Sequence, residues 1–516
     1  MVNKGTNTNS KRIASNTMVL FVRMFIMTII NLYAVRFVLN GLGKDGYGIF
    51  TSVTSVVAVA SVLNVVLALS IQRFYSFYLG KKDAKVLNEI FSSSVNIVVF
   101  LSVCVIAILE TAGLWLIYTQ LTIPQEQIDA TLWVYQFSIL TLILSILQIP
   151  YTAAVFAHED MKVYTWISTI ECLLKFAAAW SIVYAFINSL IFYAAGLLVT
   201  SIIISITYII IGRRRYNECH YHTPSDKNLY KKLLSFSGWT FFGSAANTGM
   251  IQGNTILLNV FWGPIITAAF GIAQQINNAF NTLCNTMVLA FRPPMIKAYA
   301  EHNYDYLNKL FSVSNKFIFY LLLMVAIPII TEMETILSLW LNNTSTEIVL
   351  FSRLIIVYVI CLAMNNPITI IIQASGRVKA YHLPVETTTL FCLPITWLLF
   401  SSKCPAYTVF YSMIGVVIIA HAVRCVCLKR SYPHFSYQEY ILSFILPAIA
   451  ITGLSIFTSH LILEQISKQI LHLLVAFTCI PIIIIILTYI LGISKREREL
   501  LKNLIRQIVY SKSCQK

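Results

Sequence analysis

The chain carries little charge for its length. Of its 516 residues, 11% are Asp, Glu, Lys or Arg, 58% are hydrophobic, and the mean hydropathy is +0.75. Soluble domains are about one quarter charged, so this composition excludes an ordinary soluble protein. Apolar runs of about 20 residues, enough to cross a hydrocarbon layer of roughly 30 Å, recur along the whole chain. The short alternating segments of a membrane β-barrel are missing. The sequence therefore predicts an all-α polytopic membrane protein.

The signatures of several enzyme classes are also missing. No GxxxxGK[ST] loop, HExxH pair or GxSxG turn occurs, so neither ATP hydrolysis nor the corresponding hydrolytic mechanisms are expected. The eleven cysteines are scattered and form no CxxC pair, which excludes a readable disulfide framework or zinc site. Hydrophilic segments are too short for a soluble catalytic domain. We expect neither an enzyme nor a bound cofactor or metal.

Fourteen segments are apolar and long enough to be membrane helices. They lie near residues 17–39, 46–70, 90–117, 131–157, 163–186, 188–212, 233–259, 265–291, 309–331, 349–373, 378–400, 405–428, 440–460 and 470–492. The loops on one side carry most of the Lys and Arg, whereas those on the other side carry only Lys44, Lys403 and Lys468. By the positive-inside rule, both termini are cytoplasmic. Topology and attraction to anionic lipids then explain the net charge of +16 without nucleic acid.

The predicted helices form groups of six, six and two, separated by basic segments. We predict an N-terminal six-helix lobe (1–212), a basic cytoplasmic linker (213–232), a C-terminal six-helix lobe (233–428), and a helix pair with a basic cytoplasmic tail (429–516). Residues 40–50 (NGLGKDGYGIF) and 262–273 (WGPIITAAFGIA) both place a glycine in an outer turn and an aromatic-Gly-Ile sequence at the start of the next helix. This echo is typical of parallel repeats that flank a central site.

The chain resembles the multidrug/oligosaccharidyl-lipid/polysaccharide exporter (MOP) superfamily, and within it most resembles the bacterial Wzx-type polysaccharide flippases. The stretches that carry the resemblance are LGKDGYGIF (42–50), LNVVLALSIQRFYSFYLGKKD (63–83), FRPPMIKAYAEHNYDYLNKLF (291–311), ILSLWL (336–341) and NNPITIIIQASGRVKAY (365–381). The resemblance spans nearly the full length. It implies a V-shaped, two-lobed fold with alternating access in the bacterial cytoplasmic (inner) membrane. The implied substrate is an undecaprenyl-pyrophosphate-linked oligosaccharide, moved to the outer leaflet for lipopolysaccharide (O-antigen) or capsule biosynthesis.

Side-chain amides form a stripe along the predicted helix 265–291. At 100° per residue, one arc of about 100° holds Gln274, Asn277, Asn278, Asn281, Asn285 and Arg292. Polar groups facing lipid are costly, so this stripe should face protein or a water-filled cavity. Amides suit sugar hydroxyls because each amide both donates and accepts. We predict that these amides, with Asn247 and Asn254 of the preceding helix, bind sugar; hydrogen bonding between helices is the alternative.

Cationic residues in or near the spans are candidates for binding the lipid pyrophosphate, because a guanidinium can bind two phosphate oxygens at once. Arg23 lies about 9 Å into the first span, Arg73 and Arg292 lie at the inner ends of theirs, and Lys175 lies in mid-span. We predict a pyrophosphate role for Arg23, Arg73, Lys175 and Arg292. Snorkelling to the interface is the alternative for Arg23, and positive-inside anchoring is the alternative for Arg73 and Arg292.

Glu171 lies four residues before Lys175, the favourable order for an ion pair within a helix. Mutual neutralisation is one interpretation. In the other, Glu171 accepts a coupling proton or sodium ion. We place two acids, Glu171 and Glu110, well inside the spans. Cationic residues are more numerous there, and this excess of positive charge favours an anionic substrate.

The sequence Asn365-Asn366-Pro367 predicts a kink in the span 349–373. Proline leaves a backbone carbonyl without its donor, and a neighbouring amide can satisfy it. The kink could serve as a hinge or as simple packing.

The sequence is compatible with three functions. The first is a flippase for lipid-linked oligosaccharides, working with membrane lipids and alongside polysaccharide polymerase or assembly proteins. The second is a MATE-like cation or drug antiporter, which needs a buried acid without a basic partner. The third is a non-transporting membrane scaffold of a polysaccharide-assembly complex, in which cavity mutations would be silent.

Overall fold

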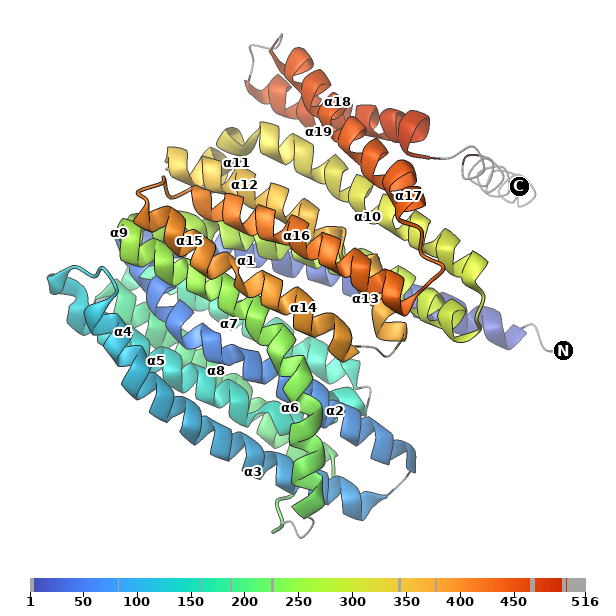
Figure 1. Ribbon diagram of the computed structural model, residues 1–516. Coiled ribbons are helices and arrows are strands. Elements are labelled where there is room, and N and C mark those ends of the chain that lie inside the picture. Colours follow the sequence, from blue (N-terminus) through green and yellow to red (C-terminus); the bar gives the residue numbers. More distant parts are fainter. Residues whose placement is uncertain are drawn as a thin grey trace. The chain divides into compact units, whose positions relative to one another are not determined.

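The computed structural model describes residues 4–81, 83–158, 160–185, 188–223, 227–341, 345–375, 378–464, 469–493 and 498. The regular elements among these residues are helices, as Figure 1 shows, and no strand occurs among them. The prediction of an all-α protein is confirmed. The helices are α1 (Lys4–Ala58), α2 (Val62–Lys81), α3 (Ala84–Ile108), α4 (Leu114–Thr119), α5 (Ile128–Leu147), α6 (Ile149–Ala157), α7 (Met161–Ser181), α8 (Ser189–Arg215), α9 (Lys227–Ala300), α10 (Tyr304–Thr331), α11 (Met333–Leu341), α12 (Thr346–Ala363), α13 (Asn366–Ala374), α14 (Val378–Leu390), α15 (Cys392–Ser401), α16 (Thr408–Ser431), α17 (Tyr437–Tyr440), α18 (Leu446–Leu463) and α19 (Gln469–Leu487).

Twelve helical segments among the described residues are long and apolar enough to cross a membrane. Two of them are far longer than the roughly 20 residues that one crossing needs: Ile26–Leu79 has 54 residues and Phe241–Val288 has 48. Each is interrupted by a glycine in a left-handed conformation, Gly43 (φ 71°) and Gly263 (φ 78°), which costs little because glycine has no Cβ. These are glycines of the two stretches that echo each other in the sequence. The count of fourteen crossings stays a prediction.

The chain forms two compact units, each built from two stretches of sequence. Unit 1 comprises Met1–Gln275 and Glu386–Ser412. In this unit α5 packs along α8, α2 packs on α6, and α1 packs on α7. Its core holds buried aromatic side chains, among them Tyr75, Phe91 and Tyr135. The backbone approaches itself closely at Gly48, where an added Cβ would lie 1.8 Å from the carbonyl oxygen of Pro264, so a larger residue cannot be accommodated without a shift.

Unit 2 comprises Ile276–Val385 and Met413–Lys516. Here α10 packs against α12 and α19, and α18 packs against α19. An aromatic cluster forms much of its core, with members from α10, the segment after α16, and α17: Phe311, Phe319, Tyr320, Tyr432, Phe435 and Tyr440. The predicted lobes were continuous in sequence, whereas each unit takes a second stretch of chain; the lobe boundaries stay a prediction.

The described part of the basic linker, residues 213–223, packs within unit 1. Arg215 pairs with Asp160 at 2.5 Å, and the Tyr216 hydroxyl donates to the same carboxylate at 3.3 Å. The His158 ring stacks on Tyr216 and lies 2.5 Å from the Glu218 carboxylate. Burial, followed by the negative charge of Asp160, raises the pKa of Tyr216 to about 12. This part of the linker is therefore a docked segment of the fold.

Candidate functional site

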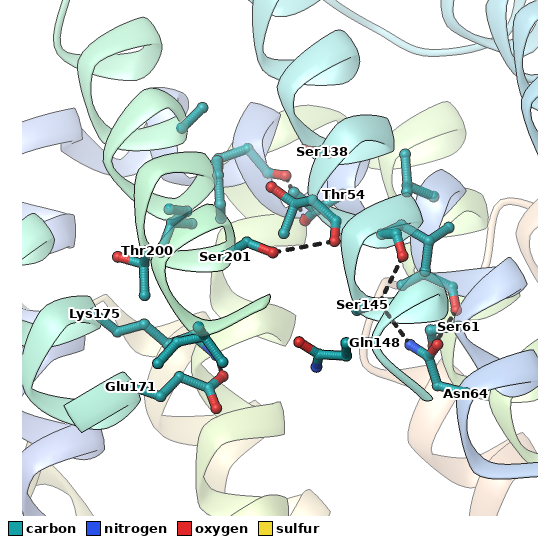
Figure 2. Close-up of a pocket in the computed structure, with 18 residues that line it drawn as sticks. Thr54, Ser61, Asn64, Ser138, Ser145, Gln148, Glu171, Lys175, Thr200 and Ser201 are labelled. Atoms are coloured by element: carbon teal, nitrogen blue, oxygen red, sulfur yellow. Dashed lines mark hydrogen bonds and ion pairs between the residues drawn. The ribbon is translucent and has the colours of Figure 1, made fainter. Parts of the chain in front are cut away.

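A cavity of about 340 Å³ lies within unit 1, among α1, α2, α5, α7 and α8, and Figure 2 shows the residues that line it. Its apolar lining includes Phe50 and Leu197. The polar lining, which is the larger group, consists of Thr54, Ser61, Asn64, Ser138, Thr141, Ser145, Gln148, Glu171, Lys175, Thr200 and Ser201. Both Glu171 and Lys175 were predicted from the sequence as functional residues, so this cavity is the candidate site.

Helical periodicity explains why the polar residues of α5 meet in one place. Ser138, Thr141 and Ser145 follow one another at three- and four-residue steps, and Gln148, which caps the helix, continues the same face. The other side of this helix exposes large apolar residues such as Trp133 and Leu140. A helix in lipid must turn its polar face inward, because lipid offers no hydrogen-bond partner. This pattern directs the α5 stripe toward the interior of unit 1.

The serine and threonine hydroxyls present mostly acceptors to the cavity. Several donate their single hydrogen to a helix carbonyl three or four residues earlier, at 2.6–2.9 Å; these are Thr54, Ser61, Ser138, Ser145 and Thr200. A hydroxyl has one donor and two lone pairs, so once the hydrogen is engaged the oxygen can only accept. The hydroxyl wall is therefore suited to a ligand that brings its own O–H or N–H donors.

Donors to the cavity are few. Gln148 accepts a hydrogen bond from Ser205 Oγ at 3.0 Å through Oε1, and its amide nitrogen donates to no protein atom in the described part of the chain. Figure 2 shows this side chain between the helices with no dashed line to the other residues drawn. The amide nitrogen of Asn64 donates one of its two hydrogens to Ser145 Oγ at 2.9 Å. Gln148 thus offers both of its amide hydrogens to a ligand, and the second amide hydrogen of Asn64 and the Thr141 hydroxyl are further neutral donors.

Glu171 and Lys175 form the ion pair that their spacing predicts. Lys175 Nζ lies 2.6 Å from Glu171 Oε1, and the side chains are 49% and 37% exposed, respectively. Each charge is compensated by the other, so the cavity offers neither a free carboxylate nor a free ammonium. No cluster of three His, Cys, Asp or Glu residues that could hold a metal ion occurs among the residues described. The ion-coupling role of Glu171 and the pyrophosphate role of Lys175 stay predictions.

The three predicted arginines are placed as follows. Arg73 is exposed on α2, and Arg292 is exposed on α9, where it donates to Gln373 Oε1 at 2.8 Å. The side chain of Arg23 lies outside the described residues. The pyrophosphate roles of all three stay predictions.

The amides of α9 that were predicted to bind sugar fall into three groups by exposure. Asn254 and Asn277 are buried, at 0% and 2% exposure. Asn254 donates to Cys392 Sγ at 3.5 Å, and Asn277 accepts from Asn281 at 2.7 Å. Gln274 and Asn281 are half-buried, whereas the exposed amides are Asn247, Asn278 and Asn285. The exposed members fit the predicted sugar contacts better than the buried ones.

Unit 2 contains a second polar cluster, around the predicted kink. Helix α12 ends at Ala363 and α13 begins at Asn366, so the kink is confirmed. The Asn366 amide donates at 3.2 Å to the carbonyl of Ala363, the one that Pro367 leaves without its helical donor. In the same region His421 Nδ1 lies 2.8 Å from Asn365 Oδ1. An amide oxygen only accepts, so we assign the ring hydrogen to Nδ1.

Sequence reasoning missed two features of these sites. Glu386 lies in α14, inside the predicted span 378–400, and is 8% exposed. Glu386 is therefore a third acid well inside the spans, besides Glu171 and Glu110. Because sequence reasoning left it out, the excess of cations inside the spans was overstated. The cavity wall around Gln148 was also missed, although the spacing of Ser138, Thr141 and Ser145 was a signal that could have revealed it.

Comparisons with known proteins agree with this fold. The structure resembles lipid II flippase MurJ in an inward closed conformation, with a TM-score of 0.69 and 13% identity over 94% of this chain and 100% of that chain. It also resembles an inward-facing multidrug resistance MATE family transporter of the MOP superfamily, with a TM-score of 0.67 and 14% identity over 80% of this chain and 96% of that one. A MOP superfamily transporter from Pyrococcus furiosus matches with a TM-score of 0.56 and 12% identity, over 80% of this chain and 95% of that chain.

No curated protein sequence matches the chain. The sequence profile of one family, described as polysaccharide biosynthesis protein, matches residues 13–299, which is more than half of the 516 residues. The chain is thus a multi-pass membrane protein with the fold of the MOP superfamily, and it belongs to the polysaccharide biosynthesis protein family.

Proposed function

We propose that the protein is a flippase that moves undecaprenyl-pyrophosphate-linked oligosaccharides across the bacterial cytoplasmic membrane by alternating access. The observation that carries the proposal is the family match over residues 13–299 on a MOP superfamily fold, which links polysaccharide biosynthesis to a transporter architecture. The neutral, hydroxyl-rich cavity of unit 1 supports it, because a glycan needs many uncharged hydrogen-bond partners.

In this mechanism, cationic residues attract the pyrophosphate and amides hold the sugars while the prenyl chain stays in lipid. Arg73 and Arg292 are exposed at the ends of their predicted spans and would meet the headgroup first. The exposed amide of Asn278 would contact sugar. Lipopolysaccharide or capsule biosynthesis would consume the product, and polysaccharide polymerase or assembly proteins would act next. Glu171 is the candidate for coupling to a proton or sodium gradient.

Translocation in proteoliposomes tests the proposal. An undecaprenyl-pyrophosphate oligosaccharide is supplied in one leaflet, and its appearance in the other is measured for wild type, Arg292→Ala and Asn278→Ala. Losing a charge-assisted hydrogen bond costs about 1.5–3 kcal/mol, so Arg292→Ala should slow translocation at least about tenfold. Arg213→Ala is the matched control, because Arg213 is an exposed arginine at the end of α8 that the proposal does not use. Wild type that does not move the glycolipid would refute the flippase.

An antiporter for organic cations is the second candidate, favoured by the fold shared with a multidrug resistance transporter. A cationic dye is therefore run in parallel with the glycolipid. Ion-driven dye movement that is lost in Glu386→Gln, without glycolipid movement, would establish the antiporter. If neither compound moves in any variant, the scaffold interpretation stands.

A further inference from the structure

The unit 1 cavity has an unusual balance of hydrogen-bonding groups. Its hydroxyl oxygens are acceptors, because the hydrogens of Ser138, Ser145 and Thr200 are already given to helix carbonyls. Gln148 contributes one open amide nitrogen. Such a wall satisfies a ligand with many hydroxyl donors and at least one acceptor.

This balance disfavours other ligand classes. An organic cation would need negative charge, but the carboxylate of Glu171 is held by Lys175 at 2.6 Å. A phosphate would need positive charge, and the Lys175 ammonium is engaged by the same contact. A purely apolar molecule would leave the hydroxyl oxygens desolvated without donors, which costs free energy for each group. A neutral polyol avoids all three penalties.

The cavity size narrows the choice further. About 340 Å³ lies at the lower end of the range of roughly 300–1,000 Å³ that ligand pockets occupy, which suits a ligand of one ring better than a long glycan. The apolar side chains of Phe50 and Leu197 line part of the wall and match the C–H faces of a pyranose.

We propose that the unit 1 cavity is a subsite for one neutral sugar ring of the glycan, with the Gln148 amide donating to a ring or hydroxyl oxygen and the serine and threonine oxygens of α5 and α8 accepting from sugar hydroxyls. The inference rests on the proposed function for the origin of the sugar, but the cavity's chemistry can be tested separately. It places a sugar contact inside unit 1 itself, apart from the amide stripe of α9.

Thiol protection tests the cavity alone. In Ser145→Cys, the introduced thiol is labelled with a small polar reagent and quantified on its own peptide by mass spectrometry. A soluble neutral disaccharide should slow labelling at least about threefold, whereas tetraethylene glycol dimethyl ether, which has acceptors but no donors, should not. The native Cys404, half-buried outside the cavity, is the internal control. Equal labelling with and without sugar, or equal protection by the ether, would overturn the proposal.

Binding of two lipids separates the subsite from the flippase function. Gln148→Leu removes the amide at similar volume and should weaken binding of undecaprenyl-pyrophosphate oligosaccharide by roughly fivefold, the worth of about one hydrogen bond. Binding of sugar-free undecaprenyl pyrophosphate should stay unchanged. Thr200→Val, in the cavity, and Thr207→Val, about two turns further along the same helix and outside the cavity lining, form a matched pair, since both hydroxyls bond the carbonyl four residues earlier. The first should weaken glycolipid binding and the second should not.

The outcomes are distinguishable. Unchanged glycolipid binding in Gln148→Leu, or an equal loss for both lipids, would refute the subsite while wild-type translocation keeps the flippase. If wild type neither binds nor moves the glycolipid, the flippase fails, and thiol protection by sugar alone then decides whether the cavity is a saccharide site.

Discussion

The cavity of unit 1 and the polar cluster of unit 2 use similar side chains in opposite ways. In unit 2, His421 bonds Asn365 at 2.8 Å through Nδ1 and lies 3.3 Å from the Tyr440 hydroxyl through Nε2. In unit 1, by contrast, the amide nitrogen of Gln148 donates to no protein atom within the described chain. Polar residues among membrane helices therefore do not by themselves distinguish a binding site from internal bonding. The distinction lies in where unused hydrogen-bonding capacity is found: among the described residues the Asn365 amide nitrogen also has no partner, but it is buried in the unit 2 cluster, whereas Gln148 lines the unit 1 cavity.

A second chain of bonds in unit 2 makes the same point. Arg424 Nε donates to the Tyr381 hydroxyl at 3.0 Å, and that hydroxyl lies 2.9 Å from Thr369 Oγ1. Since Thr369 gives its own hydrogen to the carbonyl of Asn365, Tyr381 must be the donor in the second bond. The donors run in one direction from α16 through α14 to α13. This chain of hydrogen bonds links three helices and leaves few of its polar groups open to a ligand.

The largest expected effect on stability comes from removing the centre of the unit 2 cluster. His421→Leu leaves Asn365 Oδ1 and the Tyr440 hydroxyl without their partner, and an unsatisfied buried polar group costs about 1–3 kcal/mol. We expect the free energy of unfolding to fall by about 2 kcal/mol, measured by denaturant or thermal unfolding of the purified protein. Gln148→Leu is the control and should lower it by less than about 1 kcal/mol, because it removes only the acceptor of Ser205 Oγ, which can still donate to the carbonyl of Leu144 at 3.3 Å. A larger loss of unfolding free energy in Gln148→Leu than in His421→Leu would contradict this difference between the two regions.

The features that the sequence predicted correctly are local ones. The pairing of Glu171 with Lys175 follows from their four-residue spacing, and the kink follows from Pro367 and the carbonyl it leaves open. The positive-φ glycines at 43 and 263 lie in stretches that were paired by their pattern alone. Each of these depends on a few consecutive residues, which a single sequence contains in full.

The cavity depends on contacts between residues far apart in the chain. Asn64 meets Ser145 across 81 residues, and Gln148 meets Ser205 across 57. Helical periodicity indicates which face of α5 is polar, but not which helices supply the rest of the wall. The same limit applies to the amides of α9: the arc that holds Asn277 was predicted, but the burial of Asn277, and that of Asn254, depends on neighbouring side chains, such as Cys392 at Asn254.

A smaller effect should appear when the same substitution is made in both regions. Thr369→Val removes the acceptor for the Tyr381 hydroxyl and should cost about 1 kcal/mol of unfolding free energy. Thr200→Val removes a hydroxyl that bonds a helix carbonyl of its own helix, and should cost less than about 0.5 kcal/mol. Unfolding of both variants under identical conditions checks the difference. Equal losses would mean that Thr200 is as tightly bound into unit 1 as Thr369 is into unit 2.

The smallest effect is expected for the ion pair at the cavity. Its side chains are 37–49% exposed, and ion pairs of this kind within a helix contribute about 0.3–0.5 kcal/mol because solvent screens them. A double-mutant cycle of Glu171→Gln and Lys175→Met should therefore give a coupling energy near or below about 0.5 kcal/mol. A coupling above about 1 kcal/mol would place the pair with the internally bonded groups of unit 2. A weak pair instead fits a wall whose charges cancel locally, which keeps the cavity neutral without adding rigidity, as a saccharide site requires.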